Sequence, residues 1–353
     1  MKQVVKQVVG IDVGKDKFYA CYKIKFQDSS ISLKGAKSFD NNYKGFSALS
    51  EWCAKRNKTT EIKPIYVMEA TGVYYEELAY FLHGTGELVS VHLAQKIKYF
   101  AKSCNLKTKT DKVDSKMIAE FGIEKNLQGT DFWTPPSKEF KLIRDMAREH
   151  TSLKRTGAAA KSQLHAMNHA HGYSEKMKEM KKQQIAFYEE QIKEVEAEIK
   201  RKVAEDKKLA SKIKRITKIK GIRIISVVKI ITEVNGFLLF NNIRQLVSYA
   251  GLDVVENQSG NHRGKTKISK KGNARLRSVL YFPAITASNH NKTLKKYYER
   301  IIENRTYKNQ GTVAVMRKML ILVYTLWKKD EEYIEDYLSV KQKNKGEVLI
   351  LNH

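Results

Sequence analysis

Four acidic side chains in the first third of the chain have the types and spacing of a divalent-metal site. They are Asp12 in GIDVGKDKF, Glu69 in VMEATGVYYE, and the pair Asp111 and Asp114 in DKVDSKMIAEF. Asp12 and Glu69 each end a run rich in β-branched residues, so each is expected at the end of a strand. Asp111 and Asp114 are three residues apart at the start of a helical pattern and face the same way. Oxygen-only ligands favour Mg²⁺ or Mn²⁺, and such pockets are typical of phosphoryl transfer on nucleic acids.

Each of these acids also has an ordinary explanation. Aspartate is common where a strand turns, and Asp111 or Asp114 could do no more than cap a helix. The order strand, strand, helix within one segment favours a shared metal site over four unrelated acids. Among the neighbouring acids, Asp16 is the one most easily mistaken for a ligand, and Glu76 and Glu77 are expected to face solvent.

The segments around the acids predict an α/β layer with a mixed sheet. Apolar and alternating runs predict strands at residues 7–13, 17–25, 62–68 and 88–93. Helical patterns alternate with these strands up to about residue 129. The two prolines in WTPPS at 133–137 mark the boundary of this first domain.

The rest of the chain is predicted to be mostly helical. Apolar residues recur in steps of three and four across 143–167 and again across 185–199, although His150 and Gly157 interrupt the first seam. Two such helices would form a hairpin that presents its seams to each other or to a second protomer. Further on, two short helices around Gly221 resemble a helix-hairpin-helix, whose turn amides hold backbone phosphate, but Arg223 replaces the second turn glycine.

A polar, glycine-rich stretch from 254 to 269 is predicted to be a loop, whose flexible backbone would let a hydroxyl approach a phosphate closely. Ser259 precedes Gly260 there, and Ser269 is a rival that is expected to be a helix N-cap. From these residues alone, the simpler expectation is that Ser259 only hydrogen-bonds a DNA phosphate. Cations follow it, and six are expected to contact nucleic acid and stabilise phosphoryl charge: Arg263, Lys265, Lys267, Lys270, Lys271 and Arg275.

The net charge of +28 predicts strong, salt-dependent attraction to a polyanion. A basic packaging protein would share this charge but not the pattern of strands and carboxylates. Three widely spaced cysteines without a secretory leader indicate buried, reduced thiols in the cytoplasm. The longest apolar run, 313–327, is too short for a bilayer, so no membrane partner is expected. The cluster of His165, His169 and His171 is expected to lie at a helix end on the surface, not to bind zinc.

Together the motifs resemble the DEDD transposases of insertion-sequence family 110 and the related pilin-gene invertases. The resemblance rests on GIDVGKDK, MEATGVYYE, DKVDSKMIAEF and SGNHRGKTKISKKGN, in that order, and runs from about residue 8 to residue 327. It implies an α/β RNase H-like (RuvC-like) domain at 1–133 and a helical coiled-coil linker and dimerisation arm at 134–214. A mostly α transposase domain at 215–330 and a basic tail at 331–353 complete the implied organisation.

The resemblance also implies roles for single residues and a set of partners. The metal positions fall to the four acids and the position of the nucleophile to Ser259, while Gln258 stands where many relatives have a second serine. The implied cofactor is Mg²⁺ or Mn²⁺. The implied partners are double-stranded donor and target DNA, a structured bridge RNA, and further copies of the chain in a dimer or tetramer.

These expectations describe a recombinase that cleaves and rejoins DNA through a serine, and three rivals remain. The first is a RuvC-like endonuclease in which water replaces Ser259, which would form no protein–DNA adduct. The second is an actin-like or sugar-kinase-type ATPase, which needs a second glycine-rich phosphate loop that the chain does not show. The third is an RNA-binding protein without activity, which would tolerate the loss of all four acids.

Overall fold

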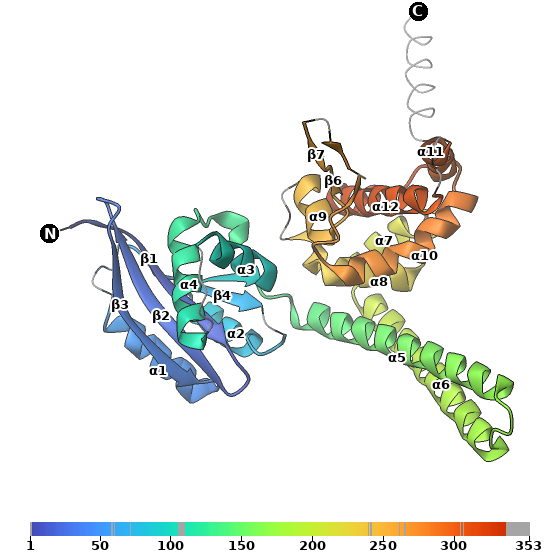
Figure 1. The fold of residues 1–353 in the computed structure, drawn as a ribbon, viewed down its shortest axis with the longest axis horizontal. Helices are drawn as coiled ribbons and strands as arrows, with labels where there is room; N and C mark the ends of the chain where they lie inside the picture. Colours follow the sequence, from blue (N-terminus) through green and yellow to red (C-terminus); the bar gives the residue numbers. More distant parts are fainter. Residues whose placement is uncertain are drawn as a thin grey trace, which may run out of the picture. The chain divides into compact units, whose positions relative to one another are not determined.

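The chain folds into two units that meet at a proline pair. The computed structural model describes residues 2–336 apart from 58, 60, 71, 105–109, 239, 241, 261, 265, 304 and 306. The first unit comprises Met1–Pro135 and the second Pro136–His353. The division falls where two consecutive prolines remove backbone donors, which interrupts helix and strand pairing alike. Figure 1 shows the strands of the first unit and the helices of the second.

A five-stranded mixed sheet forms the centre of the first unit. Its strands are β1 Val4–Val13, β2 Lys17–Phe26, β3 Ile31–Asp40, β4 Ile65–Ala70 and β5 Leu88–Leu93. Their order is β3-β2-β1-β4-β5; β1, β2 and β3 run antiparallel, whereas β4 runs parallel to both β1 and β5. The mixed α/β sheet predicted from the sequence is confirmed.

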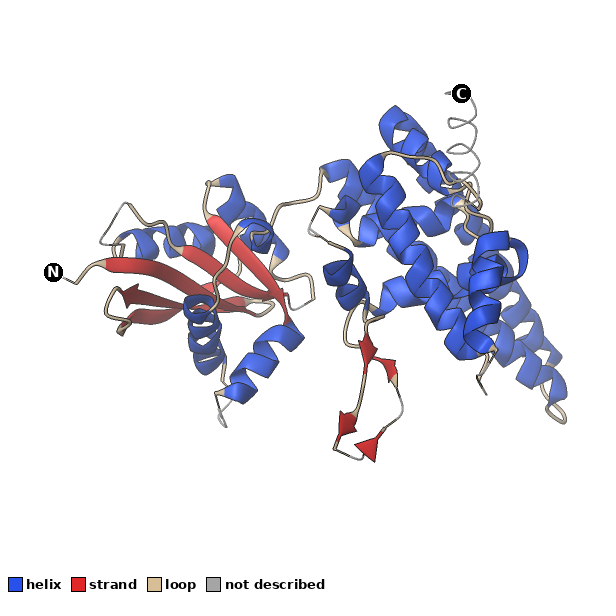
Figure 2. Ribbon diagram, turned by 90° about the horizontal axis from the view of Figure 1, so that it is seen from above, coloured by secondary structure: helices blue, strands red, loops and turns tan. Residues whose placement is uncertain are grey.

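Helices cover both faces of this sheet, and each face has its own apolar core (Figure 2). The helices are α1 Tyr43–Ala54, α2 Glu76–Gly84, α3 Ala94–Ser103 and α4 Asp111–Glu124. Val9 and Ile11 lie in the core under α1 and α2, and Val8 lies in the core under α3 and α4. Because strand side chains alternate between faces, this pattern determines which way each acid points.

The sequence did not predict β3. This strand lies at the edge of the sheet, and Phe39 is its single buried side chain. Without a buried face its alternation is weak, so the usual strand signal is missing. Its backbone nevertheless pairs with β2 from Lys17 and Asp40 to Lys25 and Ile31, so main-chain pairing determines the structure there.

The second unit is helical, as the sequence predicted. Its helices are α5 Lys138–His169, α6 Glu175–Glu205, α7 Lys207–Ile216, α8 Ile224–Glu233, α9 Ile243–Ala250, α10 Ala274–His290, α11 Lys292–Ile302 and α12 Asn309–Lys329. Each of them contributes at least one buried side chain to a single core. Among the described residues, no helix is long and apolar enough to cross a membrane.

α5 and α6 fold back on each other as a hairpin (Figure 1). At its base, Ile143 and Ala147 of α5 share the core with Ile199 and Val203 of α6. The apolar seam therefore packs within one chain there, which is one of the two expected arrangements. Because this base belongs to the same core as the C-terminal helices, the arm and the C-terminal segment form one unit. The supercoil and a role in dimerisation stay predictions.

The stretch predicted to be a loop between 254 and 269 is instead a narrow two-stranded ribbon (Figure 2). β6 Val254–Val255 pairs with β9 Lys267–Ile268, and β7 Gln258–Ser259 pairs with β8 His262–Arg263. Between these pairs the backbone nitrogen of Gly264 donates to the carbonyl of Asn257 at 2.7 Å. The described side chains of β6 and β7 are exposed, so no alternation of apolar and polar residues marks the strands in the sequence.

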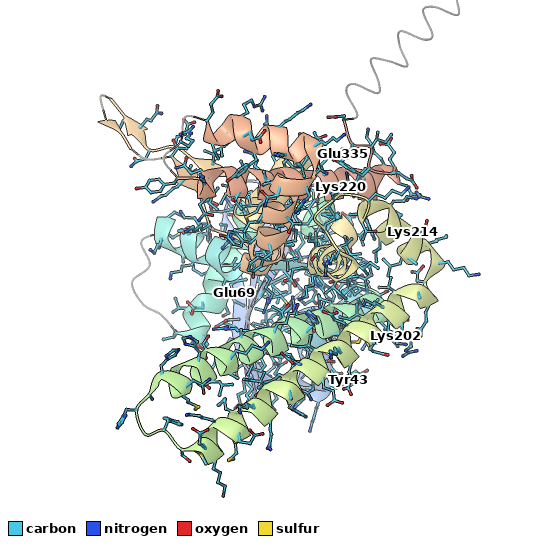
Figure 3. The ribbon with its side chains drawn as sticks, turned by 90° about the vertical axis from the view of Figure 1, so that its right-hand side faces the viewer. Tyr43, Glu69, Lys202, Lys214, Lys220 and Glu335 are labelled. Atoms are coloured by element: carbon cyan, nitrogen blue, oxygen red, sulfur yellow. The ribbon has the colours of Figure 1, made fainter. Side chains whose placement is uncertain are left out.

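The predicted basic tail is anchored where it begins. Asn291 donates from Nδ2 to the hydroxyl of Tyr333 at 2.9 Å. Glu335 accepts from the backbone nitrogen of Lys292 at 2.7 Å and forms an ion pair of 3.1 Å with Lys220 (Figure 3). Residues 337–353 of the predicted tail lie outside the described residues.

Candidate active site

Asp12 and Glu69 lie near the ends of the two central strands. The parallel register of β1 and β4 pairs Ile11 with Met68, so the next residues, Asp12 and Glu69, are neighbours on strands about 4.8 Å apart. Counting in twos from Val8, Asp12 points to the face covered by α3 and α4, and its paired residue Glu69 points the same way. Both side chains are half-buried.

α4 crosses this face in close contact with the strand backbone. A Cβ on Gly10 would lie 2.5 Å from the carbonyl oxygen of Ser115, and a Cβ on Gly122 would lie 2.6 Å from a methyl carbon of Val8. Glycine at both positions is what lets the helix approach so closely. Since Gly122 lies over Val8 and Ser115 over Gly10, the N-terminus of α4 lies toward Asp12.

Asp111 and Asp114 occupy the first turn of α4. The helix is capped by Thr110, whose hydroxyl accepts from the backbone nitrogen of Val113 at 3.3 Å. The capping role considered for the two acids therefore belongs to Thr110. Asp114 is half-buried and Asp111 is exposed, and both charges complement the positive end of the helix dipole.

The structure thus brings the four acids to one end and one face of the sheet. Among the residues that the structure describes, no three His, Cys, Asp or Glu side chains are grouped closely enough to hold a metal ion as they stand. The donor set is nevertheless oxygen-only, which fits a hard divalent cation. Asp12, Glu69 and Asp114, the residues that would hold such an ion, are half-buried, and Asp111 is exposed.

His92 lies beside Glu69, and the sequence did not single it out. It pairs with Glu69 in the register of β4 and β5 and is 6% exposed. The Ser90 hydroxyl donates to the Asp131 carbonyl at 2.7 Å, so Nε2 of His92 donates to Ser90 at 2.9 Å and Nδ1 faces Lys96. Burial lowers the pKa of His92 to about 4. A neutral ring therefore flanks Glu69 at neutral pH.

Ser259 lies toward the tip of the ribbon in the second unit. It pairs with His262 across the ribbon and is followed by Gly260, whose φ of +54° suits a residue without a Cβ. The side chain of Ser259 is exposed, so a nucleic-acid strand could reach its hydroxyl.

Ser269 is not the helix N-cap that the sequence predicted. Its hydroxyl donates to the carboxylate of Asp253 at 2.5 Å, and its backbone nitrogen donates to the Asp253 carbonyl at 2.9 Å. Asn273 caps α10 instead, accepting from the backbone nitrogen of Leu276 at 3.1 Å. Ser269 therefore secures the base of the ribbon, which explains why its position before a helix was misleading.

The described members of the predicted nucleic-acid-binding set lie along the ribbon and at its base. Lys267, Lys270 and Lys271 are exposed. Arg263 belongs to β8, but its side chain lies outside what the structure describes, as does Lys265 entirely.

Arg275 is less independent than the sequence suggested. Its guanidinium is 64% exposed, yet it lies 3.7 Å from the nearly buried carboxylate of Glu233. Arg148 already holds that carboxylate through two N–H groups at 3.1 and 3.2 Å, and Asn273 donates to it at 3.0 Å. Arg275 thus has a structural partner as well as access to solvent.

Two smaller groups complete the residues singled out in the sequence. His165 and His169 lie exposed near the C-terminal end of α5 with ring centroids 4.5 Å apart, and His171 follows in the turn. This is the expected surface cluster, and it belongs to no metal-binding group among the described residues. The cysteines were expected to be buried, which is wrong for Cys104, because it ends the amphipathic α3 on the exposed side.

Two sequence families match the chain. Residues 9–173 match the IS110-type DEDD family described as transposase, and residues 213–299 match the transposase IS116/IS110/IS902 family. The first match spans the four acids, and the second spans Ser259 and the cations around it.

Individual proteins are similar over different lengths. The pilin gene-inverting protein of Moraxella bovis is 25% identical over 331 residues, which is 93% of this chain and 98% of that protein. The transposase for insertion sequence element IS1111A of Coxiella burnetii is 31% identical over 153 residues, 42% of this chain and 39% of that protein.

Solved structures resemble about a third of the chain weakly. RuvC of T. thermophilus in complex with a Holliday junction substrate is 12% identical with a TM-score of 0.24, covering 32% of this chain and 90% of that one. The yeast mitochondrial Holliday junction resolvase Ydc2 is 14% identical with a TM-score of 0.26, covering 35% and 81%. Scores of this size carry no argument about fold or activity.

The chain combines a mixed sheet, with acids at the ends of its central strands, and a helical unit that follows it. Together with the match to a transposase family, this indicates a DNA-processing enzyme of the transposase class. The chain is similar to IS110-type transposases in two segments, residues 9–173 and 213–299.

Proposed function

We propose that this chain is a metal-dependent recombinase that breaks and rejoins DNA strands. The observation that carries the proposal is the adjacency of Asp12 and Glu69 at the ends of β1 and β4, with Asp114 approaching from the first turn of α4. The strand order and the positions of these acids support an RNase H-type catalytic fold. Such a pocket concentrates negative charge at a single point of a chain whose net charge is +28.

The acids would hold Mg²⁺ or Mn²⁺. A divalent cation bound there activates an attacking oxygen and stabilises the leaving one. Asp12 and Glu69 fix the site on the rigid centre of the sheet, and Asp114 closes it from α4. His92 contributes no charge at neutral pH, so it adds no positive charge beside Glu69.

Ser259 is the proposed nucleophile. Its Oγ attacks a DNA phosphorus, the new Oγ–P bond replaces the P–O bond to the 3′ oxygen, and the released strand ends in a 3′-hydroxyl that takes up the proton. Attack by a 3′-hydroxyl of the other strand then forms the new phosphodiester and restores the serine. No net bond energy is lost, so the exchange needs no ATP. The exposed position of Ser259 supports this role.

The proposed partners follow from charge and family resemblance. Lys267, Lys270 and Lys271 are exposed cations on the ribbon that carries the serine and at its base, and they suit DNA phosphates. So basic a chain is consistent with binding a structured bridge RNA together with donor and target duplexes. It is also consistent with a dimer or tetramer that supplies both halves of the reaction.

One rival keeps the acids but not the serine. In a hydrolytic endonuclease, water attacks the phosphate and no protein–DNA bond forms. Because Ser259 belongs to the other unit from the acids, this rival needs only the first unit for chemistry.

The experiment is a two-plasmid recombination reporter built from the gene and its flanking DNA. Asp12→Asn and Asp114→Asn are expected to abolish recombination and strand cleavage while leaving DNA affinity within about twofold, since a metal ligand positions the chemistry more than the backbone phosphates. Asp16→Asn is the matched control, because Asp16 is an exposed acid in the turn after β1. Full recombination by Asp12→Asn would remove the metal site from the proposal.

A further inference from the structure

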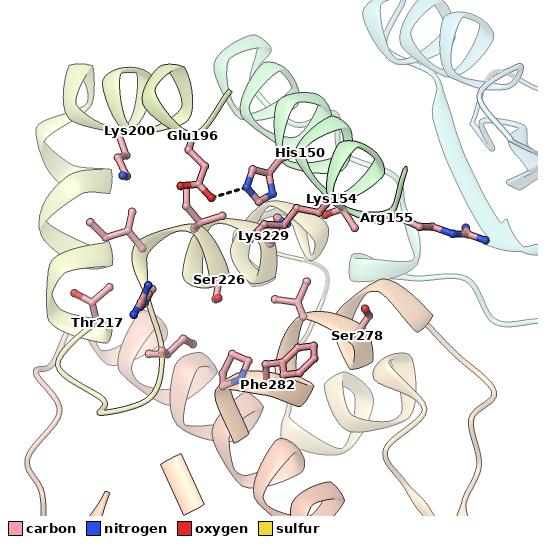
Figure 4. Close-up of a pocket in the computed structure, with 17 residues that line it drawn as sticks. His150, Lys154, Arg155, Glu196, Lys200, Thr217, Ser226, Lys229, Ser278 and Phe282 are labelled. Atoms are coloured by element: carbon pink, nitrogen blue, oxygen red, sulfur yellow. Dashed lines mark hydrogen bonds and ion pairs between the residues drawn. The ribbon is translucent and has the colours of Figure 1, made fainter. Parts of the chain in front are cut away.

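A cavity of about 960 Å³ opens in the second unit, between the base of the hairpin and the core helices (Figure 4). α5 contributes His150 and Lys154 to its wall, α6 contributes Glu196, α8 contributes Lys229, and α10 contributes Phe282. Its volume is in the range of pockets that hold small molecules and nucleotides. None of the roles proposed above uses it.

The wall of this cavity is strongly cationic. Its five cations come from α5, α6, the turn before α8, and α8: Lys154, Arg155, Lys200, Arg223 and Lys229. Within the described part of the chain, none of the five forms an ion pair. The single carboxylate of the wall, Glu196, is engaged by Nε2 of His150 at 2.7 Å (Figure 4). The cavity therefore holds a surplus of positive charge.

The surplus of positive charge affects the protonation of Lys229. Burial, together with the charge of Lys154, lowers the pKa of Lys229 to about 8. A partly buried ammonium without an ion-pair partner destabilises the fold, and a bound anion would remove that penalty. The chemistry of the wall thus calls for a negatively charged ligand.

Two polar groups of the wall lack their usual partners. His150 is 1% exposed, and its Nδ1 has no hydrogen-bond partner in the described structure. Pro283 lies inside α10, so the carbonyl of Val279, one turn earlier, has no helical N–H to accept from. His150 and Val279 both line the cavity. The Val279 carbonyl accepts hydrogen bonds, and so does Nδ1 of His150 when the imidazole is neutral. A bare phosphate offers them no donor, whereas a nucleobase does.

An aromatic ring stands at the same cavity. Phe282 is 74% exposed, although it lies on α10 directly before the buried Pro283. Ile224, the first residue of α8, adds an apolar side chain that is 40% exposed. Exposed aromatic rings beside cations are the usual platform for stacking an unpaired base.

We propose that this cavity binds a single unpaired nucleotide of a nucleic-acid strand, with its phosphate among Lys200, Arg223 and Lys229 and its base on Phe282. The ligand class is a phosphodiester with an unstacked base, and the strand that supplies it is DNA or RNA. The proposal deepens the proposed function, because strand exchange and structured RNA both create unpaired nucleotides. The second unit would then recognise an unpaired nucleotide without base-specific contacts along a long stretch of nucleic acid.

The test compares two probes with the full-length protein in EDTA, which prevents cleavage. One is a duplex with a single bulged 2-aminopurine, and the other is the same duplex fully paired. Fluorescence anisotropy gives the affinities, and 2-aminopurine emission reports stacking. Wild type is expected to bind the bulged probe about tenfold more tightly. Phe282→Ala is expected to lose about fivefold or more of that affinity and the change in emission.

Matched controls separate this site from general charge and exposure. Arg223→Gln with Lys200→Gln should abolish the preference for the bulge, whereas Lys193→Gln with Lys207→Gln, which removes the same charge outside the cavity, should retain it. Phe187→Ala removes an aromatic ring that is 55% exposed on the hairpin and should behave as wild type. Unchanged binding of the paired duplex shows that each variant is folded.

The outcomes decide the proposal independently of the catalytic one. Equal affinity of wild type for both probes, or equal losses in the cavity and control variants, overturns the nucleotide site. Loss of cleavage in Asp12→Asn with the bulge preference intact supports both proposals, whereas cleavage by Asp12→Asn with the preference intact removes only the metal site. Bulges placed in DNA and in RNA duplexes show which strand supplies the nucleotide.

Discussion

Gly10 on β1 lies directly against the backbone of Ala119 on α4: a Cβ on Gly10 would be 2.1 Å from the backbone nitrogen of Ala119. This contact sets the height of α4 above the sheet. Because the same helix begins with Asp111 and Asp114, the contact also sets how close those acids lie to Asp12. The absence of a side chain at Gly10 thus bears on the geometry of the candidate metal site.

Gly10→Ala is expected to push α4 away from β1 and to impair activity without touching an acid. Overpacking of this kind costs about 1 to 3 kcal/mol of unfolding free energy. Chemical denaturation and the recombination reporter measure the two effects. Gly84→Ala is the control, since a Cβ there meets nothing within 4 Å. A fully active, equally stable Gly10→Ala protein would contradict the role given to this contact.

Ser259→Ala is expected to stop both strand cleavage and covalent attachment to DNA, because a hydroxyl is needed to form the phosphoserine bond. Denaturing electrophoresis of labelled DNA in Mg²⁺ detects the adduct, and mass spectrometry of the modified peptide locates it. Ser269→Ala serves as the comparison: it removes the hydrogen bond to Asp253 at the base of the ribbon, which costs about 1 kcal/mol, but keeps the nucleophile. Cleavage by wild type without any retained label would favour the hydrolytic nuclease.

Lys229→Met is expected to stabilise the protein at pH 7. The pKa of Lys229 is lowered to about 8, so between pH 8 and 10.5 the unfolded chain binds more protons than the folded one. The stability contributed by this residue therefore rises with pH across that window, and its charged form destabilises the fold below it.

Urea unfolding at pH 7 and pH 10 measures this effect. The gain from Lys229→Met should be large at pH 7 and small at pH 10, whereas Lys193→Met on the exposed face of α6 should change little at either pH. An identical midpoint for Lys229→Met and wild type at both pH values would show that the buried charge is not costly.

Binding of duplex DNA is expected to weaken steeply with salt, since each neutralised phosphate adds about 0.9 to the slope of log affinity against log salt. Lys267→Gln with Lys270→Gln removes two exposed cations of the ribbon and its base and should lower that slope by about 1.8. A titration from low to physiological salt measures it. A flat response of the wild type would mean that the net charge serves solubility and not binding.

The sequence alone was sufficient where local pattern and packing agree. β5 lies at the predicted residues 88–93, and Asp12 and Glu69 come at the ends of strands whose β-branched runs are buried on both faces. The four acids could be predicted because their residue types and their order along the chain indicate a metal site before the packing of the elements is known. The helical pattern of the second half was equally plain, because long amphipathic helices repeat their signal over many turns.

Tertiary structure decided what the local signal leaves open. β3 and the ribbon at 254–268 are strands because their backbones find partners, not because their side chains alternate. The sequence predicted Ser269 as the N-cap of α10, but Asn273 is the cap. Ser269 instead bonds to Asp253, a contact between segments that the local sequence does not reveal. The cavity around Lys229 draws on helices far apart in the sequence, and His150 gave only one sign of it, as a polar residue in an apolar seam. Local residue types determine which chemistry is available, whereas long-range packing determines which groups meet, because contact between distant segments depends on the whole chain.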